Sequence, residues 1–163
     1  MAKAYLSLGS NQSPESHLTR ALAELRERFG ELVVSPFYRT AAIGFDGPAF
    51  VNGAAILETD LEPVALDAWL HALEDAHGRR RDQPRFSNRP LDIDIVFYED
   101  QVLTGPGNLR IPRPELEHAF VLRPLADIAS DFRDPVSGRT LAELWNAHPE
   151  SAIAAPEVIL HNG

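Results

Sequence analysis

The sequence predicts an α+β fold in which two helices cover one face of a four-stranded antiparallel sheet. Four segments are rich in alternating, β-branched or aromatic residues, and two other segments repeat apolar residues at helical spacing. No internal repeat, low-complexity tract or long linker divides the chain. The 163 residues are therefore expected to form a single domain, residues 1–163, large enough to bury a hydrophobic core.

The four predicted strands share apolar alternation or a high β propensity. They are residues 4–8, 32–39, 50–58 and 91–98. A Gly- and Pro-containing loop joins the second and third, which predicts an antiparallel pair.

Two amphipathic helices separate these strands. The first is expected to have Ser13 as N-cap, Pro14 as first helical residue and Gly30 at its end. The second is expected to begin at Pro63 and end near Gly78. The resulting order is that of a ferredoxin-like βαββαβ core with both helices on one face, which leaves the other face for a ligand.

Residues beyond Asp100 are expected to add to this core. They comprise an extended piece at residues 109–112, an apolar segment at 120–128, and a capped helix from Thr140 to about Trp145. These are the extra C-terminal helices of the predicted fold. Beyond Pro149 only a short strand at residues 158–160 is predicted.

The composition excludes several classes of protein. The net charge of −9 disfavours binding to nucleic acid or anionic lipid, and no apolar run approaches the roughly 20 residues of a membrane span. Zero cysteines exclude disulfides and thiolate metal sites, and no export signal is visible. We therefore expect a cytoplasmic protein that binds neither nucleic acid nor membranes.

Asp92 and Asp94 form the most informative polar pattern. The period of two in a strand places both carboxylates on one face, with Ile93 on the other. Neighbouring carboxylates repel, and magnesium is commonly held by one or two carboxylates together with substrate phosphates. The pair therefore favours a magnesium–nucleotide site, although a solvated strand face is the alternative interpretation.

An arginine-rich segment immediately precedes this pair. Five arginines fall between Arg79 and Arg89 with a single acid, Asp82. Guanidinium groups bind phosphate oxygens in bidentate fashion, so cations for phosphate and ligands for metal meet here. Taken alone, the segment would equally suit a solubilising surface or a nucleic-acid patch.

The common nucleotide-binding and catalytic motifs are absent. The sequence contains no P-loop, no protein-kinase motif set, no dinucleotide-binding glycine motif, no nucleophile elbow and no H-E-x-x-H. Phosphoryl chemistry on another fold is the remaining hypothesis.

Five stretches, in order, resemble the 6-hydroxymethyl-7,8-dihydropterin pyrophosphokinase family of folate biosynthesis. The stretches are residues 4–11 (AYLSLGSN), 35–40 (SPFYRT), 50–55 (FVNGAA), 78–95 (GRRRDQPRFSNRPLDIDI) and 120–125 (FVLRPL). The fourth is similar to the family signature G-R-x-R followed by R-W-G-P-R-x-L-D-[IL]-D-[IL]. The resemblance implies a ferredoxin-like enzyme that transfers the β,γ-pyrophosphate of ATP to the hydroxymethyl group of the pterin.

The resemblance also implies a role for particular residues. Asp92 and Asp94 would hold two Mg²⁺ ions and would be catalytic together with Arg79 and Arg89. The residues implied to bind ATP are His71, Glu74, Arg79, Arg81, Arg85, Arg89, Arg110, Arg113 and His118. The residues implied to bind the pterin are Thr40, Ala41, Ile43, Phe50, Asn52, Phe86 and Phe120.

Several positions depart from the family pattern. Phe86 replaces a tryptophan, Ser87-Asn88 replace Gly-Pro, Arg113 replaces a histidine, and His118 replaces an arginine. Two alternatives therefore accompany the main hypothesis: a paralogue that acts on a different pterin or related alcohol, and a pterin- or nucleotide-binding module without turnover. The expected partners are ATP and a reduced pterin, bound by a monomer or weak homodimer.

Overall fold

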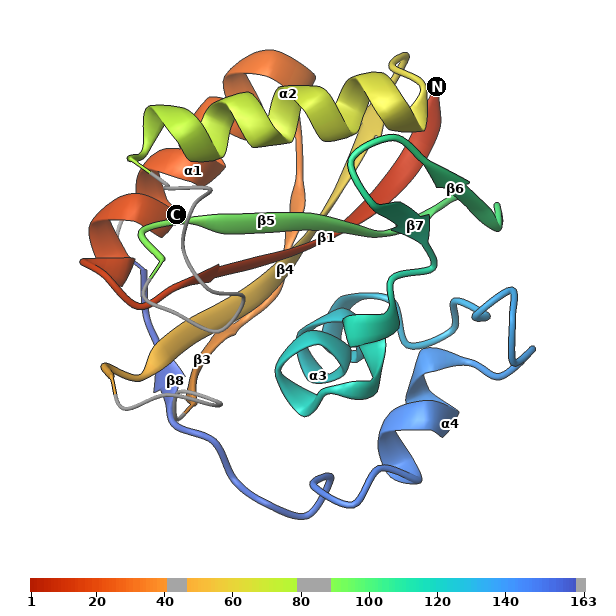
Figure 1. Cartoon of the computed structure of the whole chain (residues 1–163). Helices are drawn as coiled ribbons and strands as arrows, with labels where there is room; N and C mark the ends of the chain where they lie inside the picture. Colours follow the sequence, from red (N-terminus) through yellow and green to blue (C-terminus); the bar gives the residue numbers. More distant parts are fainter. Residues whose placement is uncertain (41–46, 79–88, 161–163) are drawn as a thin grey trace.

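The computed structural model describes residues 1–40, 47–78 and 89–160. These residues form a mixed α and β structure built on an antiparallel sheet (Figure 1). The helices are α1 (Pro14–Phe29), α2 (Pro63–Ala76), the 3₁₀ helix η1 (Pro114–Glu117), α3 (Ala119–Ile128) and α4 (Leu141–Asn146). The strands are β1 (Ala2–Ser10), β2 (Val33–Val34), β3 (Phe37–Thr40), β4 (Phe50–Thr59), β5 (Asp92–Tyr98), β6 (Leu103–Gly105), β7 (Leu109–Ile111) and β8 (Glu157–Val158).

The main sheet has the strand order β5-β1-β4-β3-β8, and β2 pairs with β4 beside β3. All of these strand pairs are antiparallel, as predicted. Strand β1 is central. Its nine residues pair with β4 on one side, and residues 4–9 pair with β5 on the other. A separate hairpin, β6-β7, follows β5.

Helices α1 and α2 cover one face of this sheet. Their apolar stripes, including Leu22 and Leu70, pack against Leu6 and Ile95 of the sheet in one continuous core. We expected the opposite face to be left for a ligand, and this expectation was wrong for part of it. Helices α3 and α4 pack there against Phe97 in a second core (Figure 1). Of the predicted site residues, Asp92, Asp94 and Asn52 lie on this same face of the sheet.

The second predicted strand is divided in two. Residues 32–39 were expected to form one strand, but pairing with β4 is interrupted at Ser35 and Pro36. Proline has no N–H to donate to a sheet. The Ser35 hydroxyl accepts the Ala54 N–H at 2.7 Å in place of a backbone carbonyl. The side chain thus satisfies a sheet donor where the strand bends.

The helix ends follow local sequence signals with one exception. Gly30 ends α1 at φ 87°, and Thr140 forms a capping box with Glu143 at the start of α4. Ser13 precedes Pro14 as predicted, but at φ 46° its side chain makes no capping hydrogen bond. Among the described residues, no helix combines the length and the apolar character needed to cross a bilayer.

Candidate active site

Asp92 and Asp94 lie on one face at the start of β5. Both are half-buried, whereas Ile93 between them is fully buried on the helix side. In the pairing with β1, Asp92 is opposite Gly9 and Asp94 is opposite Ser7. Two carboxylates this close destabilise each other unless positive charge lies nearby.

Two guanidinium groups supply that charge. Arg89 Nη1 lies 3.8 Å from Asp92 Oδ1, and Arg113 Nη2 lies 3.3 Å from Asp94 Oδ1. Arg113 Nε is also 2.7 Å from Glu115 Oε2. Burial lowers the pKa of Arg113, but the attraction of Asp94, Glu115 and more distant carboxylates outweighs burial and raises this pKa. Arg113 therefore remains a cation beside the acidic pair.

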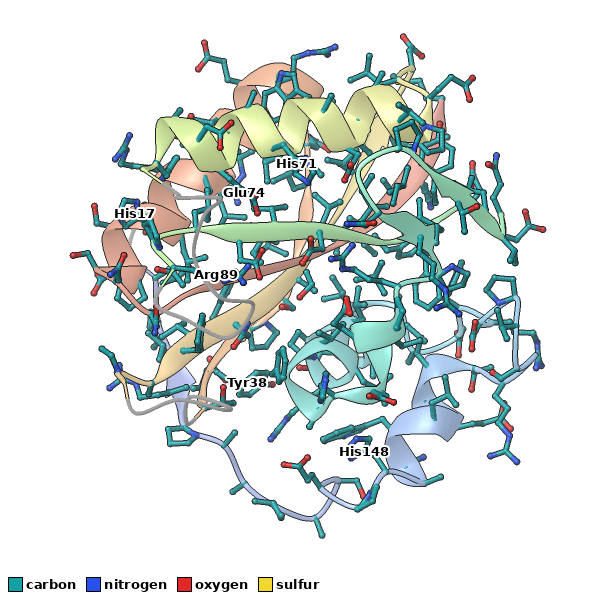
Figure 2. The ribbon with its side chains drawn as sticks, viewed as in Figure 1. His17, Tyr38, His71, Glu74, Arg89 and His148 are labelled. Carbon is teal, nitrogen blue, oxygen red and sulfur yellow. The ribbon has the colours of Figure 1, made fainter. Side chains whose placement is uncertain are left out.

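Helix α2 contributes two predicted residues from the other side of β5. Glu74 is completely buried, and its Oε2 accepts a hydrogen bond of 2.8 Å from the backbone N–H of Ile93. This bond fixes the backbone between the two aspartates. His71 is more exposed, with Nε2 3.7 Å from Asp67 Oδ1. Figure 2 shows Glu74 and His71 between α2 and β5, and Arg89 beside β5.

The residues that flank the segment 79–88 are anchored to α1 and the turn before it. His77 is hydrogen-bonded through Nδ1 to His17 Nδ1 at 2.8 Å and through Nε2 to Glu24 at 2.9 Å. Burial first, and then nearby positive charge, lowers the pKa of His17. At the other flank, Arg89 N–H donates to Asn11 Oδ1 at 2.7 Å, and Asn11 N–H donates to the Arg89 carbonyl at 3.1 Å. Arg89 therefore has a fixed backbone next to Asp92.

A single row of residues connects the acidic pair with the predicted pterin site. The sheet register aligns Asp92 with Gly9, Gly9 with Asn52, and Asn52 with Tyr38 across four strands. Directly opposed residues in antiparallel strands point to the same face. Because adjacent strands lie about 4.8 Å apart, Asp92 and Asn52 are separated by about 10 Å. Gly9 lies between them without a side chain, which leaves room for the Asn52 amide.

Asn52 borders a hollow that we call the acceptor pocket. Three residues predicted to bind the pterin line it together: Thr40 at the end of β3, Asn52 on β4 and Phe120 on α3. Thr40 Oγ1 and Asn52 Oδ1 are 3.5 Å apart. The hollow has an empty volume of about 390 Å³, which includes the solvent at its mouth. An aromatic face beside fixed amide and hydroxyl groups suits a flat polar ring.

The remaining described candidates lie around these two places. Phe50 begins β4 opposite Thr40, and it is half-buried. His118 stacks on Phe120 with ring centroids 5.0 Å apart and an interplanar angle of 12°. Arg110 is exposed on the β6-β7 hairpin, where its backbone lies opposite that of Thr104.

Six predicted site residues lie outside the described residues. They are Ala41, Ile43, Arg79, Arg81, Arg85 and Phe86.

Sequence reasoning did not identify several residues that the fold brings to the site. Gly9 and Asn11 belong to the first resembling stretch, but their only local signal is that of a turn. Arg123 and Trp145 line the acceptor pocket, and nothing in their local sequence indicates it. Their role depends on long-range packing.

Within the part of the chain that the structure describes, no group of three or more His, Cys, Asp or Glu residues could hold a metal ion. Asp92 and Asp94 are a pair. A pair suits magnesium that is completed by phosphate oxygens and water, because such a site needs only one or two carboxylates.

The chain is similar to known proteins over most of its length. Residues 5–130 match the family model described as 7,8-dihydro-6-hydroxymethylpterin-pyrophosphokinase (HPPK). The chain is 41% identical over 156 residues to a Pseudomonas aeruginosa 2-amino-4-hydroxy-6-hydroxymethyldihydropteridine pyrophosphokinase, covering 93% of this chain and 94% of that protein. A Synechocystis protein of the same name is 39% identical over 145 residues, which covers 86% of this chain and 73% of that protein.

Longer proteins match as well. The Schizosaccharomyces pombe folic acid synthesis protein fol1 is 36% identical over 155 residues, which are 92% of this chain and 21% of that protein. The structure of an HPPK-DHPS in complex with substrates superposes with a TM-score of 0.73 at 13% identity, over 92% of this chain and 45% of that chain. A Plasmodium falciparum HPPK-DHPS structure gives a TM-score of 0.69 at 15% identity, over 89% of this chain and 44% of that chain. The chain thus spans less than half the length of these solved structures, and at such identities they show the fold alone.

Proposed function

We propose a mechanism from one premise: this chain belongs to the 7,8-dihydro-6-hydroxymethylpterin-pyrophosphokinase family. The protein transfers pyrophosphate from ATP to the hydroxymethyl group of 6-hydroxymethyl-7,8-dihydropterin in folate biosynthesis. The hydroxymethyl oxygen loses its proton to solvent and bonds to the β-phosphorus of ATP, while the bond from that phosphorus to the α,β-bridging oxygen breaks and AMP leaves with that oxygen. The main support for the residue roles is the row from Asp92 through Gly9 to Asn52, which sets a carboxylate and an amide on one face of the sheet.

Asp92 and Asp94 are proposed to hold two Mg²⁺ ions together with the ATP phosphates. Support comes from the donor set: two half-buried carboxylates on one face, with cationic groups 3.8 Å and 3.3 Å away. Bound with ATP, magnesium supplies charge neutralisation and orients the phosphates for in-line displacement. The buried Glu74, hydrogen-bonded to Ile93 N–H, keeps the aspartates in register.

The arginines are proposed to hold the phosphates. Arg89 and Arg113 already lie within 4 Å of the aspartates, so phosphate oxygens bound at this place would meet both guanidinium groups. Arg79, Arg81 and Arg85 are proposed to act from the preceding segment. His71, Glu74, Arg110 and His118 complete the proposed ATP-binding set.

The acceptor is proposed to bind against Asn52, Thr40 and Phe120. Asn52 and Thr40 would hydrogen-bond the polar edge of the ring, and Phe120 would stack on its face. The remaining proposed contacts come from Phe50, Ala41, Ile43 and Phe86. The attacking oxygen would then point along the row toward Asp92, about 10 Å from Asn52, a distance that a bicyclic ring and a β-phosphate together can span.

The wider proposals concern the whole molecule. We infer a single domain, residues 1–163, of ferredoxin-like topology; the strand order β5-β1-β4-β3 and the position of α1 and α2 on one face support it. We also propose a cytoplasmic monomer or weak homodimer that does not bind nucleic acid, supported by the absence of cysteine and the net charge of −9.

Nucleotide analysis tests the activity directly. Purified protein, ATP, MgCl₂ and 6-hydroxymethyl-7,8-dihydropterin should form AMP and the pterin pyrophosphate in equal amounts. ADP as the product would refute pyrophosphoryl transfer. AMP that forms only with a different pterin alcohol would indicate a paralogue, and ligand binding without any AMP would indicate a binding module.

A further inference from the structure

Residues 149–160, here called the C-terminal segment, run from α4 to the edge of the sheet (Figure 1). At their far end β8 pairs with β3, with Val158 opposite Phe37. Arg39 N–H also donates to the Pro156 carbonyl at 2.8 Å. The segment therefore lies beside the strand that ends in Thr40, one of the residues of the acceptor pocket.

His148 anchors the beginning of the C-terminal segment. Its Nε2 lies 2.8 Å from the Glu117 carbonyl, to which it must donate, and its Nδ1 accepts the Glu150 N–H at 3.0 Å. Both bonds fit a single neutral tautomer that carries its proton on Nε2. The imidazole thus ties Glu150 to η1, which immediately precedes α3.

Arg123 of α3 holds the middle of the segment. Its guanidinium carbon is 4.3 Å from the centroid of the Tyr38 ring and 5.7 Å from that of Trp145. Its Nη1 donates to the Ile153 carbonyl at 3.3 Å. One side chain therefore connects β3, α4 and the C-terminal segment. The Tyr38 ring is itself fixed, since its hydroxyl donates to Asp127 at 2.6 Å, one turn beyond Arg123.

The part of the segment held in this way lines the acceptor pocket. Glu150, Ile153 and Ala155 line the pocket together with Thr40, Asn52 and Phe120. We propose that the C-terminal segment is the outer wall of the acceptor pocket, and this proposal rests on the proposed binding of the pterin there. In this proposal Arg123 and His148 are positioning residues that set the fit of the acceptor.

The test compares variants of the full chain. Arg123→Met keeps the length of the side chain but removes its charge and its donors, and Arg123→Lys keeps the charge. His148→Ala releases the same segment from a different anchor, so the test does not depend on one substitution. Arg28→Met is the matched control, because Arg28 lies 4.9 Å over the Phe29 ring on α1, at the opposite face of the sheet.

Three quantities are measured for each variant: KM values for ATP and 6-hydroxymethyl-7,8-dihydropterin from AMP formation, Kd for 6-hydroxymethylpterin from equilibrium dialysis, and amide exchange in residues 149–160. Loss of a cation–π contact and a hydrogen bond should raise the KM and Kd for the pterins about five- to tenfold in Arg123→Met. The KM for ATP should stay unchanged, and exchange in the segment should accelerate. Arg123→Lys should recover part of the loss, His148→Ala should resemble Arg123→Met, and Arg28→Met should resemble the wild type.

Two results would overturn the proposal. In the first, exchange in the segment accelerates while the pterin Kd stays at its wild-type value, so the segment is no wall. In the second, both KM values rise together with a lower unfolding temperature, so Arg123 only stabilises the fold. A wild-type protein that forms no AMP contradicts the proposed function alone, and the pterin titration still decides the role of Arg123.

Discussion

Gly9 lies between the acidic pair and the acceptor pocket, and Gly9→Ala should displace the Asn52 amide. A Cβ at position 9 would lie 2.4 Å from Asn52 Nδ2 and 3.4 Å from its Cγ. Ordinary contacts between such atoms are about 3.5 Å or longer. The amide must therefore withdraw by about 1 Å, while the backbone of β1 has no conformational reason to change.

The magnitude follows from the proposed hydrogen bond between the Asn52 amide and the pterin, which this displacement would break. A buried polar group that loses its partner destabilises the complex by about 1 to 3 kcal/mol. At 1.4 kcal/mol per factor of ten, the KM for the acceptor should rise about 5- to 150-fold. The KM for ATP should remain close to the wild-type value, because Asp92 keeps its place on β5 and Arg89 keeps its place just before this strand.

Steady-state AMP formation measures both KM values, and a double-mutant cycle isolates the cause. In an Asn52→Ala background the clashing amide is gone, so Gly9→Ala should have no further effect on acceptor KM. Gly53→Ala serves as the control for crowding, because its Cβ would lie 2.5 Å from the Phe37 ring on the helix side. It should lower stability by about 1 to 3 kcal/mol with a smaller effect on acceptor KM. An equal effect of Gly9→Ala in both backgrounds would refute the displacement of Asn52.

Three further predictions concern the acidic pair and two polar contacts. Asp94→Ala should abolish AMP formation while the circular-dichroism melt stays cooperative and near the wild-type midpoint; a collapsed melt would make the residue structural. Thr140→Ala should destabilise the protein by about 1 kcal/mol in urea unfolding through loss of the N-cap. Hydrogen bonds from the Thr140 backbone N–H and hydroxyl lower the pKa of Glu143, so the part of the cap that the Glu143 carboxylate supplies is present above the ordinary glutamate pKa and is lost as pH falls through the lowered value. The N-cap bond itself does not titrate, so the difference between wild type and Thr140→Ala should shrink in acid without disappearing, and a difference that does not shrink would contradict this. Burial and the bond to Asp127 raise the pKa of Tyr38 to about 12, so its stabilising contribution is complete below the ordinary tyrosine pKa and disappears as pH rises through about 12. Ultraviolet titration of wild type and Tyr38→Phe should show one late-ionising tyrosine missing from the variant, and identical titration curves above pH 10 would count against it.

Local signals predicted most elements because the physics that forms them is local. Pro63 begins α2, and the Thr140 capping box begins α4, as their sequences indicate. Both signals depend on hydrogen-bond geometry within one helical turn. The prediction was wrong where a distant strand decided the outcome: the segment 32–39 divides at Ser35 because the Ser35 hydroxyl meets Ala54 on β4.

Coverage of the sheet was also decided at long range. The apolar segment 120–128 could be recognised from its sequence, but its position over Phe97 could not. The α3 helix therefore occupies part of the face that we expected to be open. Its residues Phe120 and Arg123 then line the acceptor pocket. The resemblance of residues 120–125 implied this for Phe120, whereas nothing in the sequence indicated it for Arg123.

The sequence by itself determined that Asp92 and Asp94 share a face, because the period of a strand is a property of the backbone alone. It also identified the arginines that precede them and the family to which the stretches belong. Only the tertiary structure decided that Gly9 separates Asp92 from Asn52 and that Arg113 faces Asp94. The same holds for the C-terminal segment beside Thr40. These relations join residues far apart in the chain, and they are set by strand register and by the packing of α3, which depend on the whole core and not on any short stretch of residues.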